Sequence, residues 1–158
     1  MKNNVKCYFL VVMLQVCCLA TSCQKDNDLP AKLRAAILKI NDHEDVNNAN
    51  NIYLIIPTTG CEKCIREATK FFFEDIKRDD SRTRFVFTDI SSMKMFRAQM
   101  GFSKKNDDDR ILLDEKNEMY RSGVRTIYPI IFIPSEDGII TVDMNNYQSL
   151  LKLSALHK

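Results

Sequence analysis

The sequence lacks an excess of charge of either sign and has no tryptophan. It contains 23 basic and 21 acidic residues. Two of the basic residues, Lys2 and Lys6, lie in the first 23 residues, which contain no acid, so the remaining 21 basic residues are matched by 21 acidic ones. This balance gives no indication of nucleic acid as a partner. The length of 158 residues and the hydrophobic content of 45% suit one compact domain with its own core.

The sequence also lacks an apolar run long enough to cross a membrane. The stretch from Cys7 to Ala20 is shorter than the roughly 20 residues that a membrane-spanning helix needs. Two lysines precede it, and small and hydroxyl-bearing residues follow it up to Cys23, which is the layout of a secretory signal peptide. A retained membrane helix or a buried core helix is the alternative. We therefore expect residues 1–22 to be absent from the mature protein.

The end of this segment, LATSC, resembles the lipobox at which bacterial lipoproteins are cleaved. The resemblance implies that Cys23 becomes the N-terminus and carries lipid, although Ala20 is less typical of a lipobox than leucine. The residues CQKDND are similar to the lysine-plus-acid signal of lipoproteins sent to the cell surface. The expected location is therefore the bacterial cell envelope, with the protein lipid-anchored to the membrane on the periplasmic side or at the cell surface.

Cysteine and histidine are scarce in the remainder of the chain. Four of the six cysteines would be removed or lipidated, namely Cys7, Cys17, Cys18 and Cys23. The mature domain keeps Cys61 and Cys64, with His43 in an acidic loop and His157 next to the C-terminus. A tetrahedral zinc site takes four ligands, so we expect no metal and no other cofactor. In an oxidising compartment the two cysteines are most simply a dithiol that closes into a disulfide, and two small core residues without chemistry are the alternative.

The residues around this pair predict a strand followed by a helix. Asn51 to Pro57 is a continuous β-rich apolar run, as expected of a strand buried on both faces. Thr59 and Glu62 have the spacing of a capping box, which predicts a helix that begins at Cys61. A helix N-terminus stabilises a thiolate, and the thiolate is the nucleophile in disulfide exchange. Cys64, one turn inside the helix, could then resolve a mixed disulfide.

The remaining elements alternate between strand and helix patterns. They are a strand from Arg84, a helix from Ser91 that Gly101 ends, a short strand or hairpin at 111–113, a hairpin over 128–144 with a turn at Asp137-Gly138, and a closing helix over 145–156. The polar stretch around 111–113, including the charged run 104–110, is predicted to be a solvated insertion. Leu29 to Asp42 predicts an amphipathic helix that packs on the sheet or its edge, with a membrane-surface helix as the alternative.

From Asn51 to its C-terminus the chain resembles the thioredoxin-like family. The motifs are GCEKC after the first strand and YPIIFIPSEDGII, which is similar to the proline-containing hairpin of that family. The resemblance implies an α/β, thioredoxin-like fold with a central mixed β-sheet flanked by helices. Residues 1–22 would be the signal peptide, 23–50 a tether with the amphipathic helix, and 51–158 the thioredoxin-like domain.

The resemblance also implies a binding site for a partner polypeptide beside the dithiol. Pro129 would correspond to the cis-proline of the family, and Tyr128 would present its backbone to a bound peptide. Lys63 stands where many family members have proline, and Thr59-Gly60 replaces the usual aromatic residue before the first cysteine. Membrane-tethered thioredoxin-like proteins of bacterial envelopes are the most similar subgroup.

Two functions follow from these observations. In the first, the protein is a membrane-anchored thiol–disulfide oxidoreductase that needs no cofactor. Cys61 attacks the partner disulfide, Cys64 resolves the mixed disulfide, and Tyr128 and Pro129 bind the partner. Its partners would be protein thiols or disulfides in the cell envelope, and the protein would act as a monomer. In the second, it is a binding or structural lipoprotein whose disulfide only braces the start of a helix.

Overall fold

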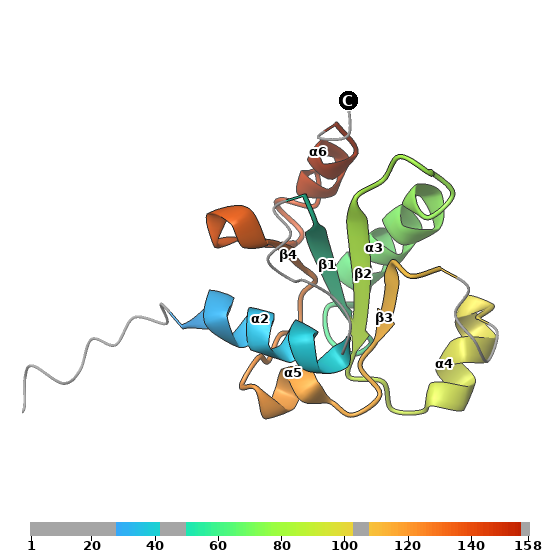
Figure 1. The fold of residues 1–158 in the computed structure, drawn as a ribbon. Helices are drawn as coiled ribbons and strands as arrows, with labels where there is room; N and C mark the ends of the chain where they lie inside the picture. Colours follow the sequence, from blue (N-terminus) through green and yellow to red (C-terminus); the bar gives the residue numbers. More distant parts are fainter. Residues whose placement is uncertain (1–27, 42–49, 103–107, 156–158) are drawn as a thin grey trace, which may run out of the picture.

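The computed structural model describes residues 28–41, 50–102 and 108–155, which form three layers (Figure 1). A mixed sheet of five strands lies between two layers of helices, so the α/β class with a central mixed sheet is confirmed, and the arrangement is consistent with a thioredoxin-like fold. The predicted signal peptide, Cys23, His43 and His157 lie outside the described residues. Within the described residues, no helix has the length and apolar character that crossing a membrane requires.

The strands run in the order β3-β2-β1-β4-β5 across the sheet. They are β1 (Ile52–Pro57), β2 (Thr83–Thr88), β3 (Ile111–Leu113), β4 (Ile130–Ile133) and β5 (Gly138–Thr141). Strands β1, β2 and β3 are parallel to one another, whereas β4 is antiparallel to both β1 and β5. A short 3-10 turn, η1 (Pro134–Glu136), and the turn residue Asp137 close the β4–β5 hairpin, which the sequence predicted.

Strand β1 explains the division of the core into two halves. Successive side chains of a strand point to opposite faces of its sheet. Tyr53 and Ile55 accordingly pack in the cluster on one face, and Leu54 and Ile56 pack in the cluster on the other. All four are 0% or 1% exposed. The continuous apolar run is therefore the pattern of a strand covered on both sides, as predicted.

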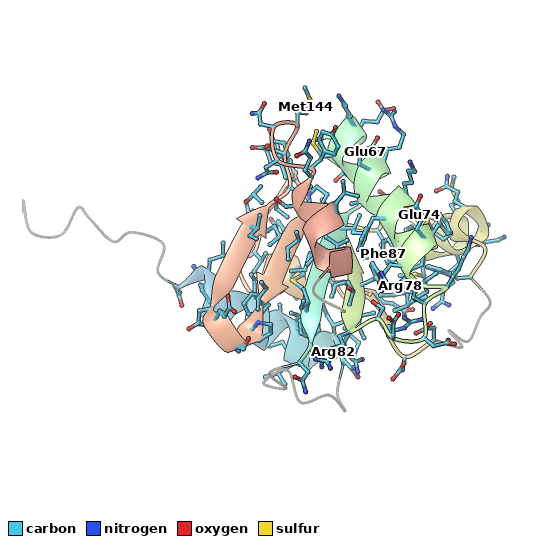
Figure 2. All side chains as sticks on the ribbon, turned by 90° about the horizontal axis from the view of Figure 1, so that it is seen from above. Glu67, Glu74, Arg78, Arg82, Phe87 and Met144 are labelled. Carbon is cyan, nitrogen blue, oxygen red and sulfur yellow. A yellow bond between two sulfur atoms is a disulfide. The ribbon has the colours of Figure 1, made fainter. Side chains whose placement is uncertain are left out.

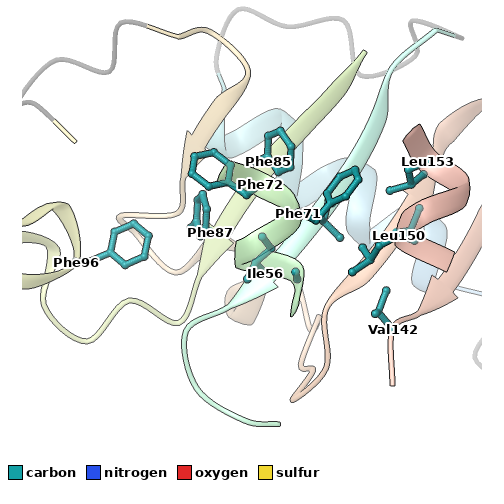
Figure 3. Packing of buried hydrophobic residues seen from close by; sticks show 12 residues of the cluster. Ile56, Phe71, Phe72, Phe85, Phe87, Phe96, Val142, Leu150 and Leu153 are labelled. Atoms are coloured by element: carbon teal, nitrogen blue, oxygen red, sulfur yellow. The ribbon is translucent and has the colours of Figure 1, made fainter. Parts of the chain in front are cut away.

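One face of the sheet is covered by α3 (Glu62–Asp75), α4 (Met93–Met100) and α6 (Ser149–Ala155). Phe72 of α3 lies over the sheet between two phenylalanines of β2 (Figure 3). Its ring meets those of Phe85 and Phe87 edge-on, with centroids 4.9 and 5.2 Å apart. This is a favourable geometry for aromatic pairs, so these contacts stabilise the packing of α3 against the sheet.

The opposite face is covered by α2 (Leu29–Ile40) and α5 (Glu118–Arg121) (Figure 1). Leu33 and Ile37 of α2 are 0% exposed and belong to the same cluster as Tyr53 of β1. The prediction that the amphipathic helix packs on the sheet is thus confirmed. The helix that the sequence placed in the tether therefore shares a core cluster with residues of the predicted 51–158 domain.

The edge strand β3 comes from the polar stretch for which a short strand or hairpin was predicted. Arg110, directly before it, donates hydrogen bonds to the carbonyl oxygens of Ile76 (2.7 Å) and Arg78 (2.8 Å) after α3. It also forms an ion pair of 2.7 Å with Asp108. The end of the charged run was predicted to be solvated, but Arg110 is part-buried because these carbonyl oxygens lack helical partners and need a donor.

Two further helix predictions are confirmed. Ser92 caps α4 by accepting a hydrogen bond from the Met95 amide, and Gly101 ends that helix in the left-handed conformation. In α6, Leu150 and Leu153 are buried against the sheet, as Figure 3 shows, whereas Leu151 is exposed. The closing helix is shorter than predicted, because residues 144–148 form turns.

We predict that Arg110→Met lowers the free energy of unfolding by about 2 to 3 kcal/mol, because two carbonyl oxygens and one carboxylate lose a charged donor. Urea unfolding provides the measurement. The matched control is Arg82→Met, whose exposed side chain is labelled in Figure 2 and should change stability by less than about 0.5 kcal/mol. Equal effects of the two substitutions would contradict the anchoring role of Arg110.

The loss of stability caused by Arg110→Met should depend on pH. The hydrogen bond from Arg110 lowers the pKa of Asp108 below its ordinary value of 3.8. A carboxyl group with a lowered pKa contributes stability above its unfolded-state pKa and loses that contribution as the pH falls through its folded-state pKa. The effect of Arg110→Met should therefore be smaller in acid than at neutral pH.

Candidate functional site: the Cys61–Cys64 disulfide at one edge of the sheet

The candidate site lies at the edge of the sheet where the parallel strands end. Ile55 of β1 pairs with Ile130 of β4, which in turn pairs with Thr141 of β5. The carboxyl ends of β1, β2 and β5 therefore meet the start of β4 at the same edge. Met144, after β5, lies at this end of the molecule with the first half of α3, where Glu67 is labelled (Figure 2).

The two cysteines form a disulfide at the start of α3, as the sequence predicted for an oxidising compartment. Their Cα atoms are 5.3 Å apart, within the usual range for a disulfide. Cys61 occupies the N-cap position and is partly exposed, whereas Cys64 is one turn inside the helix and 2% exposed. The predicted asymmetry between an accessible first cysteine and a shielded second one is confirmed.

The predicted capping box is wrong. Helix α3 begins at Glu62, its N-cap is Cys61, and no side chain caps it. Thr59 lies two residues before that cap and is exposed. The reason is Gly60, whose φ of +135° turns the chain before the helix can start. Cys61 is nevertheless the N-cap of α3, so the prediction that it lies at the N-terminus of the helix is confirmed.

Gly60 lets the chain before the helix approach the segment before β4. A Cβ atom at this position would lie 2.3 Å from the carbonyl oxygen of Ile127, a distance at which something must shift. The same carbonyl oxygen accepts a hydrogen bond of 2.8 Å from the Cys61 amide. The dithiol turn and the 124–127 segment are therefore held together by one backbone hydrogen bond that only glycine at position 60 permits.

The predicted cis bond between Tyr128 and Pro129 is wrong, because no peptide bond among the described residues is cis. The trans form is the intrinsically preferred one by about 0.5 to 1 kcal/mol. Thr126 stabilises the loop with this trans bond: its hydroxyl donates a hydrogen bond to the Tyr128 carbonyl oxygen and accepts one from the Tyr128 amide. Pro129 is buried, and its carbonyl oxygen accepts from the Val142 amide.

These hydrogen bonds change the expected role of the loop. The backbone group that contacts Cys61 belongs to Ile127, whereas both backbone groups of Tyr128 are bonded within the loop. The role of Tyr128 and Pro129 in binding a partner stays a prediction. Ile127 itself has an exposed fraction of 58%, which places an apolar side chain on the surface next to the disulfide.

Charged side chains flank the first turn of α3. Glu62 and Lys63 are both exposed, and Arg66 lies 4.0 Å from the Glu62 carboxylate. The positive charge of Lys63 favours a thiolate at Cys61, and the negative charge of Glu62 opposes it. The structure shows Arg66 as a second cation near the Glu62 carboxylate. Because both side chains are exposed, solvent screens this ion pair and its effect on the charge of Glu62 is small.

A hollow of about 460 Å³ lies on one side of the disulfide turn. Its walls come from the residues before α3, the end of β2, α5 and the segment that leads to β4, and they are Thr59, Gly60, Asp89, Tyr120, Val124, Arg125, Thr126 and Ile127. A second, more open groove of about 730 Å³ follows α3 from Thr58 and Gly60 to Lys77. Among the described residues, no three or more of the side chains that bind metals cluster to form a metal site.

Sequence reasoning missed Asp89. This residue follows β2 directly, has a φ of +57° and lines the 460 Å³ hollow. Burial, and to a smaller extent the charge of Asp114, raises the pKa of its carboxyl group. The signal that could have found it is its position after a buried parallel strand, since ligands of open α/β sheets bind at the carboxyl ends of strands.

Comparison of the chain with models of protein families, with curated proteins and with solved structures found no match. The reading of the site therefore rests on its own geometry. That geometry is an α/β fold with two cysteines at C-x-x-C spacing, bonded to each other at a helix start, which is compatible with redox chemistry.

We predict that Gly60→Ala lowers the free energy of unfolding by more than about 3 kcal/mol, because it combines an unfavourable φ with a clash against the Ile127 backbone. Gly101→Ala is the matched control: its φ is +71°, but no atom lies within 4 Å of the added Cβ. That variant should lose only about 1 to 2 kcal/mol. Denaturant unfolding of both variants is the measurement, and a loss at position 60 no larger than that at position 101 would contradict the close approach.

Proposed function

We propose that the protein is a thioredoxin-like thiol–disulfide oxidoreductase that exchanges disulfides with partner proteins outside the cytoplasm. The observation that carries this proposal is the disulfide at the N-terminus of α3, with Cys61 partly exposed and Cys64 buried. Disulfide exchange needs one sulfur that a partner can reach and a second that only the first can reach. This geometry supplies both.

The reaction begins with the reduced dithiol. The Cys61 thiolate attacks one sulfur of the partner disulfide, and the other partner sulfur leaves as a thiolate that takes up a proton. The Cys64 thiol loses its proton and attacks the Sγ atom of Cys61, which releases the second partner thiol. The partner disulfide gains two electrons and two protons, and the Cys61–Cys64 disulfide forms. The reverse sequence oxidises a partner dithiol.

The free amide groups and the positive end of the α3 dipole favour the thiolate of Cys61, since this residue is the N-cap. Tyr128 and Pro129 are proposed as contacts of the partner polypeptide, next to the exposed Ile127. A second candidate function is a binding or structural lipoprotein in which the disulfide only braces the start of α3. The hydrogen bond from Cys61 to Ile127, which ties the turn to its neighbour, favours that reading.

We predict that Cys64→Ala accumulates mixed disulfides through Cys61, because the resolving thiol is absent, and that Cys61→Ala accumulates none. Mass spectrometry of species trapped from an envelope extract measures both, alongside reduction of insulin by the intact dithiol. Equal trapping through either cysteine would contradict the assigned roles. No adducts, no insulin reduction and a disulfide that survives millimolar dithiothreitol would favour the structural lipoprotein.

The proposed location rests on the sequence that ends at Cys23. We predict that the mature protein begins at Cys23, carries lipid there and fractionates with membranes, and that Cys23→Ala releases soluble protein. Cell fractionation with mass spectrometry of the N-terminus is the measurement, and Ser22→Ala, which keeps the acceptor cysteine, is the control. Retention of the Cys23→Ala protein in the membrane fraction, with its first residues intact, would contradict the lipoprotein proposal.

A further inference from the structure

The 460 Å³ hollow beside the disulfide has the size of a site for a small molecule, which is typically about 300 to 1,000 Å³. Gly60 forms part of its wall, and the next residue is the accessible cysteine. Ile127, whose carbonyl oxygen binds the Cys61 amide, forms another part. Neither cysteine lines the hollow itself, but a molecule held here would lie beside the turn that carries the disulfide.

Two side chains of opposite charge line this hollow without pairing. The guanidinium group of Arg125 lies over the ring of Tyr120, 4.3 Å from its centroid, which holds the cation at the wall of the hollow. Asp89 lines the same hollow. Within the described part of the chain, neither charged group has an ion pair or a side-chain hydrogen bond, with each other or with any third residue.

Two separate opposite charges around one small hollow fit a ligand that carries both. An amino acid that is not in a peptide chain bears an α-ammonium group and an α-carboxylate on one carbon atom, whereas an internal residue of a polypeptide has neither of these two groups. An arginine binds a carboxylate with charge-assisted hydrogen bonds, and an aspartate binds an ammonium group in the same way. We propose that the hollow binds the amino-acid group of a small disulfide, with Arg125 at its carboxylate and Asp89 at its ammonium group.

Two properties of Asp89 fit this role. Its φ of +57° lies in the left-handed region, which aspartate adopts more readily than most residues and which also occurs at Asn117 and Asp137. This conformation keeps the residue after β2 at the wall of the hollow. Burial and the charge of Asp114 raise the pKa of its carboxyl group, which means that the ionised form lacks compensation in the free protein. An ammonium group in the hollow would supply that compensation.

The proposal rests on the proposed oxidoreductase function and names a substrate class for the same dithiol. The Cys61 thiolate attacks one sulfur of the bound disulfide, and the first amino-acid thiol leaves with a proton. Cys64 then loses its proton, attacks Cys61 and releases the second amino-acid thiol. One disulfide is reduced to two thiols, and the protein dithiol supplies both electrons. A dithiol reductant such as dithiothreitol restores the reduced protein.

The test uses four small disulfides that differ in charge. L-cystine carries both charges, cystamine only ammonium groups, 3,3'-dithiodipropionate only carboxylates, and bis(2-hydroxyethyl) disulfide none. The full mature chain is reduced, separated from reductant and mixed with each disulfide, and the released thiol is followed. Each rate constant is divided by that of the same disulfide with free dithiothreitol, which corrects for differences between leaving thiols.

The expected normalised rate is roughly tenfold higher for cystine than for the neutral disulfide, with the singly charged disulfides between them. Arg125→Gln should slow cystine and dithiodipropionate about three- to tenfold but not cystamine. Asp89→Asn should slow cystine and cystamine by a similar factor but not dithiodipropionate. Arg121→Gln, an exposed arginine of α5 outside the hollow, should change none of the rates.

The neutral disulfide separates the possible failures. Unchanged rates with it would show that the variants are folded and that their dithiol is intact. Equal normalised rates for all four disulfides would overturn the proposal that the hollow binds an amino-acid group. In that case, faster reduction of insulin under the same conditions would show that the dithiol acts on protein partners. If the reduced protein exchanges with none of the disulfides, including the neutral one and insulin, both the oxidoreductase function and this substrate class are wrong.

Discussion

Strand β1 is buried on both faces, and the presence of a helix layer on each side of the sheet follows from this constraint. Helix α2 must cover the side chains of Tyr53 and Ile55, and α3 must cover those of Leu54 and Ile56. The chain that continues such a strand must reach the surface, because a buried loop would leave backbone polar groups without partners. For β1 that continuation is the turn that carries the disulfide, so the burial of the strand places the cysteines at the edge of the sheet.

At this edge, one backbone hydrogen bond joins segments that lie far apart in the sequence. The Cys61 amide donates to the carbonyl oxygen of Ile127, and Gly60 is the residue that allows the approach. The bond uses a donor at the start of α3 that has no partner within the helix. It therefore fixes the accessible cysteine against the segment before β4, and residues from both segments, among them Gly60 and Ile127, line the hollow.

The sequence predicts the parts of this structure that depend on local patterns. The apolar run from Asn51, the helical pattern from Ser91 that Gly101 ends and the Asp137-Gly138 turn are strong local signals, and the elements they predict are present. The errors concern contacts between distant segments. Thr59 fits a capping box by spacing, but the approach of Gly60 to Ile127 moves the cap to Cys61.

Contacts between distant segments also explain the other differences between the sequence-based predictions and the structure. The cis form of Pro129 was implied by a resemblance, whereas the hydroxyl of Thr126 and the pairing of Pro129 with Val142 close the loop around a trans bond. The part-burial of Arg110 depends on carbonyl oxygens more than 30 residues earlier. Asp89 and Arg125 are ordinary polar residues in the sequence, and only the fold brings them to one hollow.

Two aspartates near this edge show how structural and functional roles differ. Asp114 is 1% exposed, yet its carboxylate accepts hydrogen bonds from the Thr88 hydroxyl and from two amides at the start of α5, so the fold accounts for it. Asp89 has a positive φ, and its carboxylate has no such partners among the described residues. A buried or partly buried charge without compensation lowers stability. The positive φ at position 89 suits an aspartate, which adopts this conformation more readily than most residues. No contact among the described residues uses its carboxylate, however, whereas a ligand in the hollow would.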